Sequence, residues 1–156
     1  MEFSTCYIRK ALKTDAQQLS QLAMKAKGYW GYDPEFLKRC EAELTITCDF
    51  IENNPIYVIE LSNMIYGFYG LSNDEEKQTY LEYMFVDPEW IGHGLGKRLW
   101  THVLMTCKEN QISEFKIAAD PFAENFYKKM GAQRIGEIQS SIAAGRTLPL
   151  MSYVVK

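Results

Sequence analysis

Residues 86–99 read Val86-Asp87-Pro88-Glu89-Trp90-Ile91-Gly92-His93-Gly94-Leu95-Gly96-Lys97-Arg98-Leu99. Three alternating glycines stand between an apolar run typical of a strand and one typical of a helix. Because glycine has no Cβ, backbone N–H groups there can approach a ligand closely. A helix that begins at this point adds free N–H groups and the positive end of its dipole. The segment therefore predicts a seat for a phosphate or pyrophosphate group, with an ordinary glycine-rich turn as the alternative.

Spacing excludes two other phosphate-binding motifs. A P-loop ends in Lys followed by Ser or Thr after a longer interval between glycines, whereas Lys97 is followed by Arg98. A dinucleotide fingerprint needs a third glycine three residues after the second. That position holds Lys97 or Leu99, depending on which glycine is taken as the first. Neither a P-loop nor a Rossmann-type site is therefore expected.

The composition indicates one folded domain over residues 1–156. Hydrophobic residues make up 47% and aromatic residues 13% of the chain, which suits a sizeable core and argues against disorder. The net charge of -3 argues against a surface that coats nucleic acid. A cytoplasmic protein without nucleic-acid or membrane partners is expected, because no signal peptide and no apolar stretch of membrane-spanning length are found. The four cysteines form no Cys-x-x-Cys pair, so free and mostly buried thiols are expected.

The order of the segments predicts a single α/β domain. Strands are expected where apolar and β-branched residues gather, over residues 7–9, 56–61, 64–71, 78–86, 115–119, 133–138 and 148–155. Helices are expected after the caps Asp15, Asp33 and Asp120, and after the glycine-rich turn. This order gives a β-meander in the middle of the chain and β-α-β units in its second half.

The glycine-rich turn resembles motif A of the GCN5-related N-acetyltransferase (GNAT) family. In that family the pattern Arg/Gln-x-x-Gly-x-Gly/Ala holds the pyrophosphate of acetyl-coenzyme A (acetyl-CoA) through backbone amides. Here the two glycines of the pattern are Gly94 and Gly96, and Ile91 stands at the first position instead of Arg or Gln. At this position members of the family contact the cofactor largely through backbone groups, which a change of side chain leaves in place.

A second segment, residues 119–132, resembles motif B of the same family. Ala123, Phe126, Tyr127 and Gly131 fit its pattern, whereas the early Asn of that pattern is replaced near Phe122. The two motifs lie at the family's separation, and the order of elements fits along nearly the whole chain. The chain is therefore identified from its sequence as a member of the GNAT family.

The resemblance implies a mixed, mostly antiparallel sheet flanked by helices, with a splayed central strand pair that holds the cofactor. It implies acetyl-CoA as co-substrate. No metal is expected, because a lone His in a turn has no ligand spacing around it. The residues implied to contact acetyl-CoA belong to the strand end, the glycine-rich turn and the last helix: Phe85, Val86, Ile91, Gly92, His93, Gly94, Leu95, Gly96, Lys97 and Asn125.

Two residues are candidates for acid–base catalysis. Tyr127 matches the motif B tyrosine, which lies near the thioester sulfur and can protonate the leaving thiolate; core packing is the alternative, since Tyr127 shares a stripe with Ala123 and Met130. Glu82 is the candidate base, because an acid in an apolar central strand is expected to be buried with a raised pKa. Its alternatives are a pair with a nearby Lys or Arg, and deprotonation by ordered water.

The acceptor site is expected at the loop between the first two helices and at a later loop. Tyr29, Trp30 and Tyr32 lie in a loop with Gly28 and Gly31, where they form either a lid over a substrate or hydrophobic plugs. Arg146 in the later loop binds an acceptor carboxylate or forms a structural salt bridge.

The function implied by the resemblance is acetyl transfer from acetyl-CoA to a primary amine. The acceptor is expected to be a small molecule or an amino acid-like compound, used by direct transfer, and the protein is expected to be a monomer or homodimer. The alternative is a catalytically weak acyl-CoA-binding sensor or partner module of the same fold.

Overall fold

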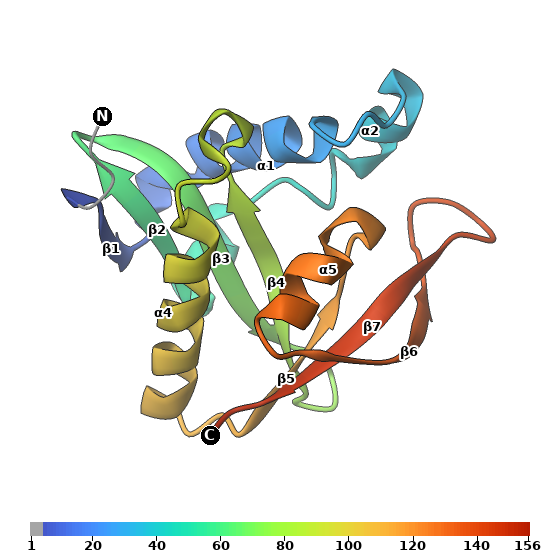
Figure 1. Cartoon of the computed structure of the whole chain (residues 1–156). Helices are drawn as coiled ribbons and strands as arrows, with labels where there is room; N and C mark the ends of the chain where they lie inside the picture. Colours follow the sequence, from blue (N-terminus) through green and yellow to red (C-terminus); the bar gives the residue numbers. More distant parts are fainter. Residues whose placement is uncertain (1–4) are drawn as a thin grey trace.

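The computed structural model describes residues 5–156 and consists of a seven-stranded sheet with helices on both faces (Figure 1). The strands are β1 (Tyr7–Lys10), β2 (Ile56–Leu61), β3 (Met64–Asn73), β4 (Thr79–Val86), β5 (Glu114–Ala118), β6 (Gln133–Gln139) and β7 (Thr147–Val154). Their order is β1-β2-β3-β4-β5-β7-β6, and every neighbouring pair is antiparallel except β4 and β5. The expected mixed, mostly antiparallel sheet is confirmed.

The helices divide the core into two clusters on opposite faces of the sheet. They are α1 (Ala16–Gly28), α2 (Pro34–Cys40), α3 (Cys48–Asn53), α4 (Leu95–Glu109) and α5 (Glu124–Lys129), with the 3-10 turns η2 (Lys13–Asp15), η3 (Pro88–Trp90) and η4 (Pro121–Ala123). α4 and α5 bury residues such as Leu99 and Tyr127 in one cluster, and α1 and α2 bury residues such as Leu19 and Phe36 in the other. Within residues 5–156, no helix is long and apolar enough to cross a membrane.

The central strands β4 and β5 are paired at a single register position, where Tyr80 lies opposite Lys116. Both strands continue beyond this position, β4 to Val86 and β5 to Ala118. They separate toward their C-terminal ends, with α4 as the crossover between them (Figure 1). The expected splayed strand pair is thus present, and it leaves unpaired backbone along the facing edges.

A β-bulge interrupts β4 at Glu82. In the pairing with β3, Gly70 lies opposite Tyr83 but Leu71 lies opposite Leu81, so Glu82 has no partner of its own. The extra residue shifts the alternation of side chains: Leu81 packs in the α4 cluster and Tyr83 in the opposite one. The expectation that Glu82 is buried is therefore wrong, because the bulge leaves this side chain exposed.

Two other local features differ from the sequence prediction. α3 was not predicted; its cap is Thr47, whose hydroxyl accepts from the Phe50 N–H at 3.0 Å. Asp15 precedes α1 as expected, but its carboxylate does not cap that helix. It accepts from Arg9 at 2.9 Å and from the Leu12 N–H at 2.8 Å instead.

The four cysteines agree with the prediction from the sequence. All are free, and Cys6, Cys40 and Cys107 are buried, whereas Cys48 is exposed. Burial raises the pKa of Cys107 to about 11 and keeps this thiol protonated at neutral pH.

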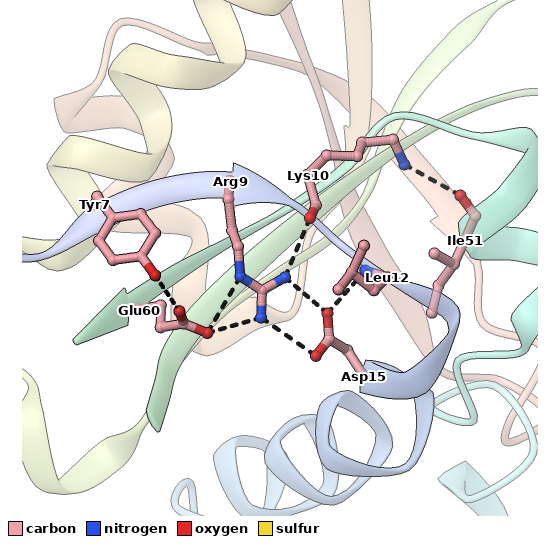
Figure 2. Close-up of polar contacts among 7 residues, drawn as sticks. All are labelled: Tyr7, Arg9, Lys10, Leu12, Asp15, Ile51 and Glu60. Carbon is pink, nitrogen blue, oxygen red and sulfur yellow. Dashed lines mark hydrogen bonds and ion pairs between the residues drawn. The ribbon is translucent and has the colours of Figure 1, made fainter. Parts of the chain in front are cut away.

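Arg9 on β1 links the start of α1 to β2 through two carboxylates (Figure 2). Its guanidinium lies 2.9 Å from Asp15 Oδ2 and 2.7 Å from Glu60 Oε2, and the Tyr7 hydroxyl donates to the other Glu60 oxygen. Both carboxylates are buried, so these contacts compensate the loss of hydration. The hydrogen bond from Arg9, followed by that from Tyr7, holds the pKa of Glu60 below its usual value.

We expect Glu60→Gln to lower the free energy of unfolding by about 1.5 kcal/mol at neutral pH, because an amide replaces a charged acceptor. The pKa of Glu60 is lowered in the folded state, so its stabilising effect is complete above the unfolded-state pKa of about 4.3 and is lost as the pH falls through the folded-state value. Urea unfolding across pH should show the difference disappearing in acid. Glu52→Gln, which removes an exposed pair with Lys13, is the control with little effect. A pH-independent difference would contradict the charge-based explanation.

Candidate active site

A cleft of about 930 Å³ lies where β4 and β5 separate. Its lining comes from β4, the end of β5, the glycine-rich turn with the start of α4, the end of α1, and the segments that hold Phe122 and Arg146. This volume is at the upper end of the range for small-molecule sites. The cleft thus joins the predicted seat for the cofactor to the predicted acceptor loops.

Glycine is needed at the positions of this turn for two different physical reasons. Gly92 and Gly94 have φ angles of 92° and 79°, in the left-handed region that glycine adopts without strain. α4 begins directly after Gly94, so the N–H groups of residues 95–97 have no partner within the helix. A Cβ on Gly96 would lie 3.1 Å from the Phe126 ring, so this glycine allows α4 and α5 to pack closely. The turn therefore presents free N–H groups and a helix dipole to the cleft, which suits a pyrophosphate.

Most of the predicted cofactor residues line the cleft: Phe85, Val86, Ile91, Gly92, Gly94, Leu95, Gly96 and Lys97. His93 and Asn125 lie outside the lining and are exposed, and the His93 ring packs edge-on to Trp90 at 5.8 Å. Arg98, the next residue after Lys97, donates to the Cys6 carbonyl at 2.6 Å, away from the turn. Contacts of His93 and Asn125 with a cofactor stay predictions.

Tyr127 on α5 both packs in the core and lines the cleft. Its buried ring lies 6.0 Å from Trp100 and 5.4 Å from Phe126, measured between ring centroids. Burial, followed by the charge of Asp120, raises the pKa of its phenol, so the hydroxyl keeps its proton at neutral pH. This group can therefore donate a hydrogen bond to an atom that gains negative charge in the cleft.

Glu82 also lines the cleft, where it is exposed at the β4 bulge. The Ser72 hydroxyl on β3 donates to its carboxylate at 3.0 Å. Glu82 occurs in none of the ion pairs formed among residues 5–156, so the alternative of a structural pair with a Lys or Arg is wrong. Its position is compatible with a base that works directly or through water.

Aromatic rings lie along the part of the cleft where the sequence predicts the acceptor site. Trp30 stacks on Phe122 at a centroid distance of 5.3 Å and an interplanar angle of 6°, and Tyr29 packs edge-on to Trp30 at 5.0 Å. Trp30 is 37% exposed, and Tyr29 and Phe122 are each 54% exposed. The alternative that Tyr29 and Trp30 are core plugs is therefore wrong. Phe122 was not predicted; it lies in η4, close to the loop of Tyr29 and Trp30 only in the folded chain.

Tyr32 and Arg146 contact each other beside these rings. Tyr32 stacks on Phe36 at 4.6 Å and lies outside the lining of the cleft, but its hydroxyl accepts from Arg146 at 3.0 Å. Arg146 lines the cleft and also donates to the Ser140 hydroxyl at 3.4 Å. Its guanidinium forms no ion pair with a carboxylate of the described residues, so the alternative of a structural salt bridge is wrong.

Lys27 and Asp120 belong to the site but had no functional signal in the sequence. As predicted, the Asp120 carboxylate caps η4 by accepting from the Phe122 N–H at 2.9 Å. Because capping alone explains an Asp at this position, the sequence offered no reason to expect a second role. It also accepts from Lys27 at 2.5 Å and from the Tyr32 hydroxyl at 3.0 Å. The side chains of Lys27 and Asp120 are each 15% exposed and line the cleft. Because the pair joins α1 to the end of β5, no local pattern could have predicted it.

The sequence matches the Acetyltransferase (GNAT) domain over residues 16–143. The chain belongs to the GNAT family. The motif A glycines thus lie at the start of α4, and the motif B tyrosine lies on α5.

Relatives of this GNAT domain are distant in sequence. The 5-NmdU N-acetyltransferase of Pseudomonas phage PaMx11 is 26% identical over 131 residues, which is 83% of this chain and 89% of that protein. The uncharacterized N-acetyltransferase ycf52 of Gracilaria tenuistipitata var. liui is 24% identical over 91 residues, which is 58% of this chain and 50% of that protein. The match thus spans about half the length of ycf52.

Solved GNAT structures share the fold. The PaiA N-acetyltransferase from Thermoplasma acidophilum, solved in complex with coenzyme A, superposes with a TM-score of 0.80 at 17% identity, covering 96% of this chain and 99% of that one. A GCN5-related N-acetyltransferase from Rhodopseudomonas palustris gives a TM-score of 0.81 at 17% identity, covering 99% and 98%. At this identity the likeness is one of fold.

Proposed function

We propose that this chain is an acetyl-CoA-dependent N-acetyltransferase that transfers the acetyl group directly to a primary amine of a small or amino acid-like acceptor. One observation carries the proposal: a single cleft connects the free N–H groups at the start of α4 to the polar and aromatic side chains of the acceptor loops. A co-substrate with a pyrophosphate at one end and a thioester at the other suits such an elongated arrangement of groups. Membership of the GNAT family supports the same reaction.

The chain offers groups for each part of this co-substrate. The N–H groups of residues 95–97 suit the pyrophosphate, and the exposed Lys97 adds positive charge beside them. The unpaired edge of β4, near Phe85 and Val86, supplies backbone groups for the pantetheine arm and the thioester oxygen. Holding both reactants in one cleft also contributes to the rate by orienting them.

The proposed reaction forms a carbon–nitrogen bond and breaks a carbon–sulfur bond. The acceptor amine loses a proton to Glu82, directly or through water, and its nitrogen attacks the thioester carbonyl carbon. The sulfur leaves with the electron pair of the broken bond, and the Tyr127 hydroxyl donates to it. The products are an amide and the thiol of coenzyme A.

We expect Glu82→Gln to lower kcat/KM for the acceptor across the pH range, because an amide cannot accept the ammonium proton. Steady-state rates across pH with one amine would measure this. Glu75→Gln, in the β3–β4 connection and outside the lining of the cleft, is the matched control that should keep the parent profile. If the Glu82→Gln profile equals that of the parent, ordered water rather than Glu82 is the base.

We expect Trp30→Ala to raise the KM for the acceptor about tenfold while leaving the Kd for acetyl-CoA unchanged, because the exposed Trp30–Phe122 stack lies at the acceptor end. The melting temperature should change little, since a side chain that is 37% exposed leaves no core cavity. Kinetics with a varied amine and calorimetry with acetyl-CoA measure the two effects. A large fall in melting temperature with an unchanged acceptor KM would contradict the lid.

The function itself is tested by release of the coenzyme A thiol from acetyl-CoA in the presence of a broad panel of amines. The panel should include 5-NmdU, because the phage relative is named for it. Amine-dependent thiol release with formation of the acetylated amine is expected. Tight binding of acetyl-CoA without turnover of any amine would favour the alternative, a sensor or partner module of the same fold.

A further inference from the structure

Arg146 places a positive charge on the wall of the cleft without a negative charge to neutralise it. Its guanidinium lies 4.9 Å from the centroid of the Phe36 ring, and its hydrogen bonds go to two neutral groups, the hydroxyls of Tyr32 and Ser140. A guanidinium has five N–H donors in a planar fork, so donors remain after these two bonds. Because Arg146 lines the cleft, these remaining donors can bind an anionic group of a ligand there.

The neighbouring carboxylate is already neutralised by another cation. Asp120 is bound by Lys27 at 2.5 Å, and the Tyr32 hydroxyl bridges Asp120 and Arg146 at 3.0 Å on either side. The negative charge of Asp120 is therefore balanced by Lys27, whereas Tyr32 holds the Arg146 guanidinium in place through a neutral contact. Tyr32, Asp120 and Lys27 are thus positioning residues for Arg146.

The lining also carries carboxylates without a cation partner. Glu82 is bound by the Ser72 hydroxyl and Glu43 by the Ser141 hydroxyl, and neither forms an ion pair with any of residues 5–156. Two further cations of the lining, Lys97 and Lys129, come from α4 and from α5, away from the loop of Arg146. The acceptor end therefore combines a free guanidinium with free carboxylates.

We infer that the acceptor is a zwitterion, with a carboxylate that binds Arg146 as well as the amine that is acetylated. This inference rests on the proposed function and names its substrate class. Among the residues that line the cleft, Arg146 is the only arginine, and its one positive charge matches the one negative charge of a carboxylate, which it can bind through two parallel hydrogen bonds. The carboxylates of Glu82 and Glu43 complement the ammonium group of the same molecule.

The test measures binding of reaction products, so that it needs no turnover. Calorimetry on the protein saturated with coenzyme A compares N-acetyl amino acids, with apolar, aromatic, acidic and basic side chains, against the N-acetyl amines that lack only the α-carboxylate. N-acetyl aminophosphonates form a third arm that separates a phosphate-like anion from a carboxylate. We expect at least one amino acid derivative to bind about tenfold more tightly than its amine counterpart.

Variants assign this preference to Arg146. Arg146→Gln should remove it without changing the Kd for coenzyme A, and Arg146→Lys should restore part of it. Tyr32→Phe should weaken binding of the N-acetyl amino acid but not of the matching N-acetyl amine, because the hydroxyl that links Arg146 to Asp120 is lost. Arg134→Gln, at a surface pair with Glu124 and Glu137, is the matched control that should keep the preference.

Three results would overturn the inference: equal or undetectable binding of the acids, a preference for phosphonates, or a preference that persists in Arg146→Gln. The Kd for coenzyme A is measured first in every sample. A failure of the proposed function appears as absent coenzyme A binding, or as absent thiol release with the panel of amines, and is therefore distinguishable from a failure at Arg146.

Discussion

Replacing Gly94 by leucine is expected to weaken acetyl-CoA binding by about 100-fold, because several charge-assisted hydrogen bonds to the pyrophosphate depend on the backbone at this turn. Gly94 has a φ of 79°, which a leucine adopts only with strain, and it lies directly before the first free N–H groups of α4. The space around it is open, so the substitution does not clash with neighbouring atoms. Gly96 is a poorer choice, because its Cβ would approach the Phe126 ring and disturb packing.

The matched control for this prediction is Gly145→Leu. Gly145 has a φ of 78° and open space around it, so the same substitution causes the same kind of backbone strain outside the lining of the cleft. Calorimetry with acetyl-CoA should show a parent-like Kd for Gly145→Leu and a large increase for Gly94→Leu. Equal Kd values for the two variants would place the pyrophosphate elsewhere.

Tyr127→Phe is expected to lower kcat by about 100-fold while the Kd for acetyl-CoA stays near that of the parent. General acid groups contribute this much to rates, and the substitution removes only the hydroxyl that donates to the leaving sulfur. The melting temperature should stay near that of the parent protein, because the phenylalanine ring keeps the contacts with Trp100 and Phe126. Single-turnover kinetics would separate the chemical step from product release.

The control for Tyr127→Phe is the same substitution at Tyr153. Tyr153 also packs on Trp100, with the ring centroids 5.2 Å apart, but lies outside the lining of the cleft. Tyr153→Phe should therefore leave kcat unchanged. A parent-like kcat for Tyr127→Phe would make Tyr127 a packing residue and leave protonation of the sulfur to solvent.

The turn and the order of elements could be predicted because they depend on neighbouring residues. The positive φ angles of Gly92 and Gly94 require residues without a Cβ, and the helix that follows them has a clear apolar face. The same holds for Asp33, whose carboxylate accepts from the Phe36 N–H at 2.9 Å as a cap should. Such signals depend only on neighbouring residues, so they can be read from a single sequence.

The environment of Glu82 could not be predicted in the same way. Strict alternation along β4 implied a buried carboxylate, but the bulge depends on how β3 pairs with β4, which no pattern within β4 records. The cluster around Asp120 could not be predicted for a related reason. Its members come from α1, the loop after it, the end of β5 and the loop before β7, and they meet only after the sheet has formed.

The most direct test of the account is a crystal structure of this protein soaked with acetyl-CoA. We expect the pyrophosphate within hydrogen-bond distance of the N–H groups of residues 95–97, the pantetheine arm along the free edge of β4, and the thioester sulfur near the Tyr127 hydroxyl. A pyrophosphate bound away from the start of α4, or a thioester outside the cleft between β4 and β5, would contradict the account.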